Sequence, residues 1–179
     1  MSEDQKMPEG PTRAGFCAII GAPNAGKSTL VNQLTGSKVS IVSHKVQTTR
    51  ARIRAIAMEG NAQIVLVDTP GIFKPKRTLD RAMVSNAWGG AGDADAVVLL
   101  VDGRPGLTEE AKEIIAHLSH TKTKAVLVIN KIDLMSRERL MEVAAAFNAA
   151  YPFEQTFMVS ALNGSGTQDL LRYLASKMP

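Results

Sequence analysis

The stretch Gly21-Ala-Pro-Asn-Ala-Gly-Lys-Ser28 decides the fold of this 179-residue chain. It fits the pattern G-x-x-x-x-G-K-S, in which glycines let the backbone curl so that successive N–H groups point at a phosphate chain. The apolar run Phe16–Ile20 before it predicts a buried strand, and a helix is expected from Lys27 to just before Gly36. A helix N-terminus adds a partial positive charge at the same place. The motif in this strand–loop–helix setting therefore predicts a phosphate-binding loop.

Two further features supply groups for a metal ion and a terminal phosphate. In the loop, Lys27 can reach the β- and γ-phosphates as a point charge, and Ser28 offers a hydroxyl to Mg²⁺. Downstream, Asp68-Thr-Pro-Gly71 follows the expected strand Gln63–Val67. Asp68 can hold the Mg²⁺ shell through water, and the Gly71 N–H can approach a γ-phosphate with no side chain in the way. The pattern D-x-x-G is weak alone, but after a phosphate loop and an apolar strand it indicates a switch segment.

The segment Asn130-Lys131-Ile132-Asp133 predicts which base is bound. It follows the expected strand Ala125–Ile129. The Asp133 carboxylate can accept two parallel hydrogen bonds from the N1–H and 2-amino groups of guanine, a pair of donors that adenine lacks. Asn130 can bind the base edge and tie loops together, and the Lys131 stem can cover the ring face. The order and spacing of these residues favour guanine over adenine.

A fourth, shorter motif, Ser160-Ala161-Leu162, follows the last expected strand, Thr156–Val159. A backbone N–H here can meet the guanine O6, although the motif carries weight only through its place after the others. The residues predicted to hold the nucleotide are Gly21, Ala22, Pro23, Asn24, Ala25, Gly26, Lys27, Ser28, Thr29, Asn130, Lys131, Asp133, Ser160, Ala161 and Leu162.

The rest of the chain alternates strand and helix patterns, which predicts a mostly parallel sheet with helices on both faces, a three-layer α/β fold. Gly60-Asn61 is a hairpin-turn signal. Residues 1–12 are expected to be a disordered leader and 13–179 one domain. The further strands are expected at 52–58 and 96–101, and the further helices at 78–88, 109–120, 136–150 and 167–177.

Composition excludes several classes of protein. With 45% hydrophobic and 21% charged residues the chain suits one compact domain. A single cysteine, Cys17, cannot form an internal disulfide, so a disulfide-rich secreted scaffold is excluded. The longest apolar run, Ala96–Val101, is too short for a transmembrane segment, and the N-terminus lacks a signal-peptide pattern, so a cytoplasmic location is expected.

The net charge of +4 is ordinary, but its distribution is uneven. Seven cations and no acidic residue lie between Gly10 and Met58. One end of the fold is therefore expected to be positive. For the cluster around Arg50, contact with phosphate or RNA and simple solvation of a loop are equally weighted.

Taken together, the four motifs resemble the translation-factor-like class of GTPases over residues 14–178. The stretches Lys38-Val-Ser-Ile-Val-Ser-His-Lys-Val-Gln-Thr-Thr-Arg50 and Pro70-Gly-Ile-Phe-Lys-Pro-Lys-Arg77 resemble more narrowly the switch regions of the Era family, GTPases of bacterial small ribosomal subunit assembly. The resemblance implies a P-loop NTPase G domain with a six-stranded sheet. It also implies GTP and GDP as nucleotides, Mg²⁺ as the metal, and a switching cycle driven by slow GTP hydrolysis.

The same resemblance assigns further roles. Thr49 is expected to reach Mg²⁺ and the γ-phosphate in the GTP state, with Thr48 as the alternative. Lys27, Thr49 and Gly71 would then form the catalytic set, and Ser28, Thr49 and Asp68 the metal set.

Two residues of the nucleotide site carry additional expectations. Ile72 stands where Ras-like enzymes have a water-orienting glutamine, so we expect backbone groups of the switch loops to hold the water instead. Asn24 either stabilises the turn after Pro23 or helps hold a K⁺ ion beside the phosphates, as in related GTPases with an apolar residue at the glutamine position.

The resemblance also implies a second domain, because in the Era family the G domain is followed by an RNA-binding KH domain. We expect this KH domain to be absent from this chain. Gly103-Arg-Pro-Gly106 spells the GXXG of a KH clamp but follows a buried strand, so a loop is expected there. The implied partners are the small ribosomal subunit and its 16S rRNA, mainly through the missing KH domain. Peripheral association with the inner membrane is left open, and a monomer is favoured.

Two rival interpretations remain at this point. The first is a nucleotide-gated binding module with negligible hydrolysis, which Ile72 favours because an isoleucine cannot orient water. The second is a related GTPase that acts on the large ribosomal subunit or on tRNA, which the match in the switch regions disfavours.

Overall fold

The computed structural model describes residues 12–36, 52–68 and 94–179 of the chain. In this part of the chain, six strands form one sheet in the order β2-β3-β1-β4-β5-β6. The strands are β1 (Arg13–Gly21), β2 (Arg52–Glu59), β3 (Ala62–Asp68), β4 (Ala96–Asp102), β5 (Val126–Asn130) and β6 (Thr156–Met158). The helices are α1 (Lys27–Thr35), α3 (Glu109–Thr121), α4 (Arg137–Ala150) and α5 (Thr167–Ser176), with short 3-10 turns η1 (Pro23–Ala25) and η2 (Ile132–Leu134).

Every neighbouring pair of strands in the sheet is parallel except β2 with β3. These two strands form a hairpin whose turn contains Gly60, in a left-handed backbone conformation (φ +56°) that favours glycine. The predicted hairpin at Gly60-Asn61 and the predicted six-stranded, mostly parallel sheet are both confirmed.

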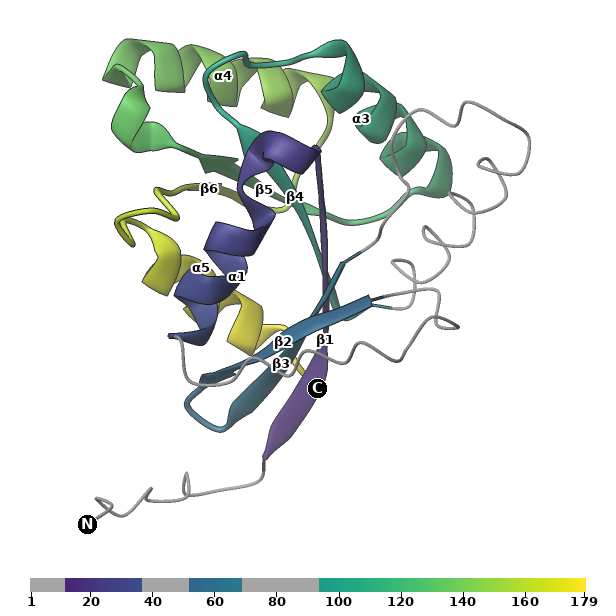
Figure 1. Ribbon diagram of the computed structural model, residues 1–179. Helices are drawn as coiled ribbons and strands as arrows, with labels where there is room; N and C mark the ends of the chain where they lie inside the picture. The colour runs from purple at the N-terminus through teal and green to yellow at the C-terminus, as the bar shows by residue number, and fades with distance from the viewer. Residues whose placement is uncertain (1–11, 37–51, 69–93) are drawn as a thin grey trace.

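Helices cover both faces of this sheet, as Figure 1 shows. One hydrophobic cluster joins α1 and α5 to Cys17 and Ile19 of β1, and the other joins α3 and α4 to Ala18 and Ile20. Successive side chains of a strand point to opposite faces, so the continuous apolar run of β1 fills both clusters. The three-layer α/β prediction is therefore confirmed.

The helix ends follow the signals in the sequence. The Thr108 hydroxyl accepts a hydrogen bond from the Ala111 N–H (3.2 Å), and the Ser136 hydroxyl accepts one from the Arg139 N–H (3.1 Å). Such caps satisfy N–H groups that have no partner inside the helix. Gly36 ends α1 in a left-handed conformation (φ +62°).

Some predictions differ from the structure or lie outside it. Phe16 is 49% exposed rather than buried. The pairing of β1 with β4 begins only at Cys17, so Phe16 has a paired strand residue on one side alone, Val65 of β3. The buried Cys17 has a thiol whose pKa burial raises to about 12, which fits its place in the core. The expected leader up to Pro11 and the expected helix at 78–88 lie outside the described residues.

In the described ranges, no helix combines the length and the apolar character that crossing a membrane would require. The parallel strands β1, β3, β4 and β5 run in the same direction, so their carboxyl ends meet at one edge of the sheet. Loops at that edge are where open α/β sheets bind ligands.

Candidate functional site

The predicted phosphate loop follows the carboxyl end of β1. Gly21, the last residue of β1 and the first of the loop motif, pairs with Leu100 of β4. A Cβ on Gly21 would lie 2.5 Å from the Leu100 carbonyl oxygen. After the turn η1, Gly26 adopts a left-handed conformation (φ +96°) and starts α1. Glycine is required at both positions, at the first for space and at the second for backbone conformation.

The first turn of α1 fits a phosphate group. Gly26 provides no side-chain cap to the helix, and the first turn contains no acidic residue. Lys27 is half-buried, whereas Ser28 and Thr29 are exposed. A helix N-terminus that carries N–H donors, a lysine and a hydroxyl has the donor set that a phosphate and its magnesium ion require.

The buried side chain of Asn130, at the end of β5, joins two of the predicted motifs. Its Nδ2 donates to the carbonyl oxygen of Ala25 in the phosphate loop (2.8 Å), and its Oδ1 accepts from the N–H of Ala161 (2.9 Å). A Cβ on Gly26 would lie 2.4 Å from that same Nδ2. The expectation that Asn130 ties loops together is therefore what the geometry shows.

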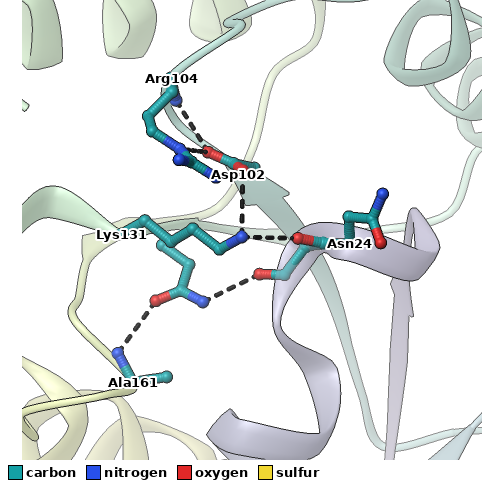
Figure 2. A network of polar contacts seen from close by, with 7 residues as sticks. Asn24, Asp102, Arg104, Lys131 and Ala161 are labelled. Carbon is teal, nitrogen blue, oxygen red and sulfur yellow. Dashed lines mark hydrogen bonds and ion pairs between the residues drawn. The ribbon is translucent and has the colours of Figure 1, made fainter. Parts of the chain in front are cut away.

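Lys131 adds a second connection to the phosphate loop. Its Nζ donates to the carbonyl oxygen of Asn24 (2.9 Å) and lies 3.1 Å from Oδ2 of Asp102 (Figure 2). The backbone of Lys131 is left-handed (φ +69°), which is uncommon for a residue other than glycine. The tip of this side chain, and not only its stem, therefore belongs to the site.

Asp102, the last residue of β4, is a site residue that the sequence did not single out. Its carboxylate accepts hydrogen bonds from the backbone N–H (3.0 Å) and the guanidinium of Arg104, the shortest of them 2.8 Å. Partial burial raises the pKa of this carboxyl, but the hydrogen bonds from Arg104 and Lys131 outweigh it and lower the pKa to about 2. No sequence motif marks it, because its place in the site follows from its register with Asn130 on the neighbouring parallel strand.

The residues predicted to bind the base lie close by. Asp133 is exposed in η2, directly after Lys131. Leu162 is 79% exposed, two residues after the fully buried Ser160. The Ala161 N–H, which was expected to meet the guanine O6, donates to Asn130 in this structure.

The predicted Mg²⁺ and γ-phosphate residues are described only in part. Asp68 ends β3, where its backbone pairs with Ile19 of β1, two residues before the phosphate loop begins. Thr49, its alternative Thr48, and Gly71 lie outside the described residues.

A cavity of about 420 Å³ lies on the α3 side of the loop. It is lined by Ala22, Asn24, Asp102 and Arg104, together with residues of β4 and α3. Since its lining contains neither Asn130 nor Asp133, this cavity is separate from the place predicted for the base.

Comparison with known proteins gives a family. Residues 16–131 match the family described as 50S ribosome-binding GTPase. A protein named GTPase Era from Afipia carboxidovorans is 64% identical over 169 residues, which are 94% of this chain and 55% of the relative. The GTPase Era of Brucella melitensis is 59% identical over 94% of this chain and 54% of its own length. The chain thus spans about half the length of the curated relatives that it matches.

Solved structures give the same result. The crystal structure of Era in complex with MgGDPNP and nucleotides 1506–1542 of 16S ribosomal RNA matches with a TM-score of 0.76 and 34% identity, over 94% of this chain and 58% of that one. The structure of Aquifex aeolicus Era bound to GDP.AlF4⁻ matches with a TM-score of 0.75 and 33% identity, over the same shares.

Removing the Asn130 amide should destabilise the fold. In Asn130→Ala the buried Ala25 carbonyl and Ala161 N–H both lose a partner, so we expect the free energy of unfolding to fall by roughly 2–4 kcal/mol. Urea denaturation followed by circular dichroism measures the change. Asn148→Ala is the matched control, because the Asn148 amide also donates and accepts hydrogen bonds, with Ala144 and Thr156, but is exposed on α4. Equal losses in the two variants would contradict the structural role given to Asn130.

Proposed function

The chain belongs to the family of 50S ribosome-binding GTPases and, within it, to the Era group, and from this membership we propose that it binds GTP and GDP with Mg²⁺ and hydrolyses GTP. Membership in the Era group confirms the resemblance that the sequence motifs indicated. The observation that carries the proposal is the Asn130 side chain, which holds the phosphate loop and the segment at Ala161 together. A nucleotide that spans both segments would meet a phosphate site and a base site with a fixed separation.

We assign the phosphate chemistry to the loop from Gly21 to Thr29. Its backbone N–H groups and Lys27 would neutralise charge that spreads over the γ-phosphate oxygens while water attacks in line. Mg²⁺, when bound, supplies charge neutralisation between the β- and γ-phosphates. Ser28, Asp68 and Thr49 are the proposed metal ligands, directly or through water. Gly71 would donate its N–H to the γ-phosphate, so Lys27, Thr49 and Gly71 form the proposed catalytic set.

We assign base recognition to Asp133 and its neighbours. The carboxylate of Asp133 is exposed, so the N1–H and 2-amino groups of guanine could reach it and donate hydrogen bonds to it. The Lys131 stem and the exposed Leu162 would cover the two faces of the purine, which accounts for an apolar side chain left in solvent. The Ala161 N–H would have to share its donation between Asn130 and the guanine O6.

The biological role proposed is a switch in small ribosomal subunit assembly. Supporting it are the relatives named GTPase Era and the Era structure that contains a 16S rRNA fragment. We propose that residues 13–179 are the GTPase domain, and that contact with 16S rRNA rests mainly on a KH domain of the kind that the resemblance to the Era family implies. We place this monomeric domain in the cytoplasm, with peripheral association with the inner membrane as a further proposal.

The family description, which names the 50S particle, favours a second candidate: a GTPase that acts on the large subunit. That description covers the family as a whole, whereas the similarity to Era proteins reaches 57% identity over all 179 residues. The small-subunit role is therefore the one we propose.

Changing Asp133 to Asn should change which base is preferred. The amide oxygen can still accept the N1–H of either base, but the amide N–H donates to the C2 carbonyl of xanthine and repels the 2-amino group of guanine. GDP affinity should therefore fall about tenfold to a hundredfold and XDP affinity should rise. Calorimetric titration with GDP, XDP and ADP measures this. Asp169→Asn, an exposed carboxylate on α5, is the control and should leave all three affinities unchanged. Unaltered GDP preference in Asp133→Asn would remove Asp133 from the base site.

A single-turnover assay separates an enzyme from a binding module. Chain loaded with GTP and Mg²⁺ should convert the nucleotide to GDP, slowly because Ile72 cannot orient water. Thr49→Ala should slow this conversion about tenfold or more, and Thr48→Ala should leave it nearly unchanged. GTP that stays intact in the unsubstituted chain would establish the binding module instead, and equal, negligible effects of both substitutions would remove the threonine assignment.

Turnover in KCl and NaCl tests whether Asn24 helps hold a potassium ion. If it does, hydrolysis should be faster in KCl, and Asn24→Ala should abolish the difference between the salts. The control Asn32→Ala removes an exposed asparagine from α1 and should keep the difference. Identical rates in both salts for the unsubstituted chain would leave Asn24 as a turn-stabilising residue.

A further inference from the structure

The carboxylate of Asp102 is oriented by contacts other than the one with Lys131. Arg104, two residues along the chain, contacts it through its backbone N–H, its Nε (3.1 Å) and its Nη2 (2.8 Å). Asp102 itself is fixed by the pairing of β4 with β5, where its register partner is Asn130. With a side chain that is 15% exposed, Asp102 keeps much less contact with water than Arg104, at 50%. The Asp102 carboxylate is therefore a hydrogen-bond acceptor held in a fixed orientation.

Lys131 brings an ammonium group to this acceptor and to the phosphate loop at once. Its Nζ lies 3.1 Å from Asp102 Oδ2 and 2.9 Å from the Asn24 carbonyl oxygen. Figure 2 shows the ammonium between the end of β4 and the loop. A lysine side chain loses considerable rotamer entropy when its tip is fixed in one position. The net free energy of one hydrogen bond to a neutral carbonyl offsets only part of that loss. The charged hydrogen bond to Asp102 is the stronger contact, so Asp102 is what fixes the tip of Lys131.

With side chains 15% and 27% exposed, the Asp102–Lys131 pair is partly buried, and a contribution to stability does not by itself explain its place beside the phosphate loop. What distinguishes it is its location, because Asp102 ends β4, Lys131 directly follows the buried Asn130, and the same ammonium also donates to the Asn24 carbonyl of the phosphate loop. Two cations, Arg104 and Lys131, surround one carboxylate, and Asp133 adds a second negative charge near Arg104. The arrangement places the ammonium where it holds a loop carbonyl, with the stem of Lys131 stretched from the base motif to the loop.

We propose that Asp102 is a positioning residue for the guanine nucleotide, acting through Lys131. By holding the ammonium against the Asn24 carbonyl, it keeps the Lys131 stem in place as one wall of the purine site and keeps the phosphate loop in the conformation that receives the phosphates. The inference rests on the proposed nucleotide binding. Its consequence is kinetic: without the Asp102 carboxylate the bound nucleotide leaves faster.

The test is the release rate of a fluorescent GDP analogue, chased with unlabelled GDP in a stopped-flow instrument. Asp102→Asn should speed release about tenfold, the effect of losing one charge-assisted hydrogen bond. Asp169→Asn, which removes an exposed carboxylate on α5 far from this contact in the sequence, is the matched control and should change release less than about twofold. The single-turnover hydrolysis rate of Asp169→Asn should stay within about twofold of that of the unsubstituted chain.

A double-mutant cycle distinguishes positioning from general loosening. In a Lys131→Met background, Asp102→Asn should have no further effect on release, because its target is gone. The same acceleration in both backgrounds would overturn the proposal, and so would an unchanged release rate in Asp102→Asn.

If Asp102→Asn does not fold, Asp102→Glu takes its place. This variant keeps the charge but moves the carboxylate by one methylene, so it should also speed release, and an unchanged rate would again overturn the proposal. Binding of GDP by the unsubstituted chain reports on the proposed function itself, whereas the ratio between variant and unsubstituted release rates reports on Asp102.

Discussion

The rest of the site depends on one buried amide, that of Asn130. Its donor holds the Ala25 carbonyl and its acceptor holds the Ala161 N–H, so three loops that follow three different strands are fixed to one another. The same contact explains a constraint in the phosphate loop: at Gly26 a Cβ would lie 2.4 Å from the amide nitrogen. Glycine is therefore required at this position both by backbone conformation and by packing.

Most of the fold could be predicted because its signals are local. The hydroxyls of Thr108 and Ser136 cap the helices that follow them, and Gly60 makes the hairpin turn. Continuous apolar runs mark strands that are covered on both faces, as β1 and β4 are. The boundaries moved by only a few residues, as at β1, which begins at Arg13 and not at Phe16.

The part of the site that could not be predicted depends on contacts between strands. Asp102 and Arg104 have no motif of their own, and their role follows from the pairing of β4 with β5, which no local pattern reveals. The left-handed backbone at Lys131 is equally hidden, since lysine rarely adopts it. The sequence motif predicted that the stem of Lys131 contacts the purine, but the direction of its ammonium depends on Asp102 of the neighbouring strand.

The same geometry links stability to binding. Asn130 is buried in the edge of the sheet and also sets the distance between the phosphate loop and the base segment, so the packing of β4 and β5 and the shape of the site are one structural feature. A ligand that binds only this folded arrangement must stabilise it, by RT ln(1 + [L]/Kd). Conversely, a substitution that weakens the packing at the carboxyl ends of β4 and β5 should lower the affinity of the site for its ligand, even when the substituted residue does not contact the ligand. In the proposed function, selectivity for guanine would depend in this sense on the packing of β4 and β5 as a whole, with Asp133 as the residue proposed to read the base.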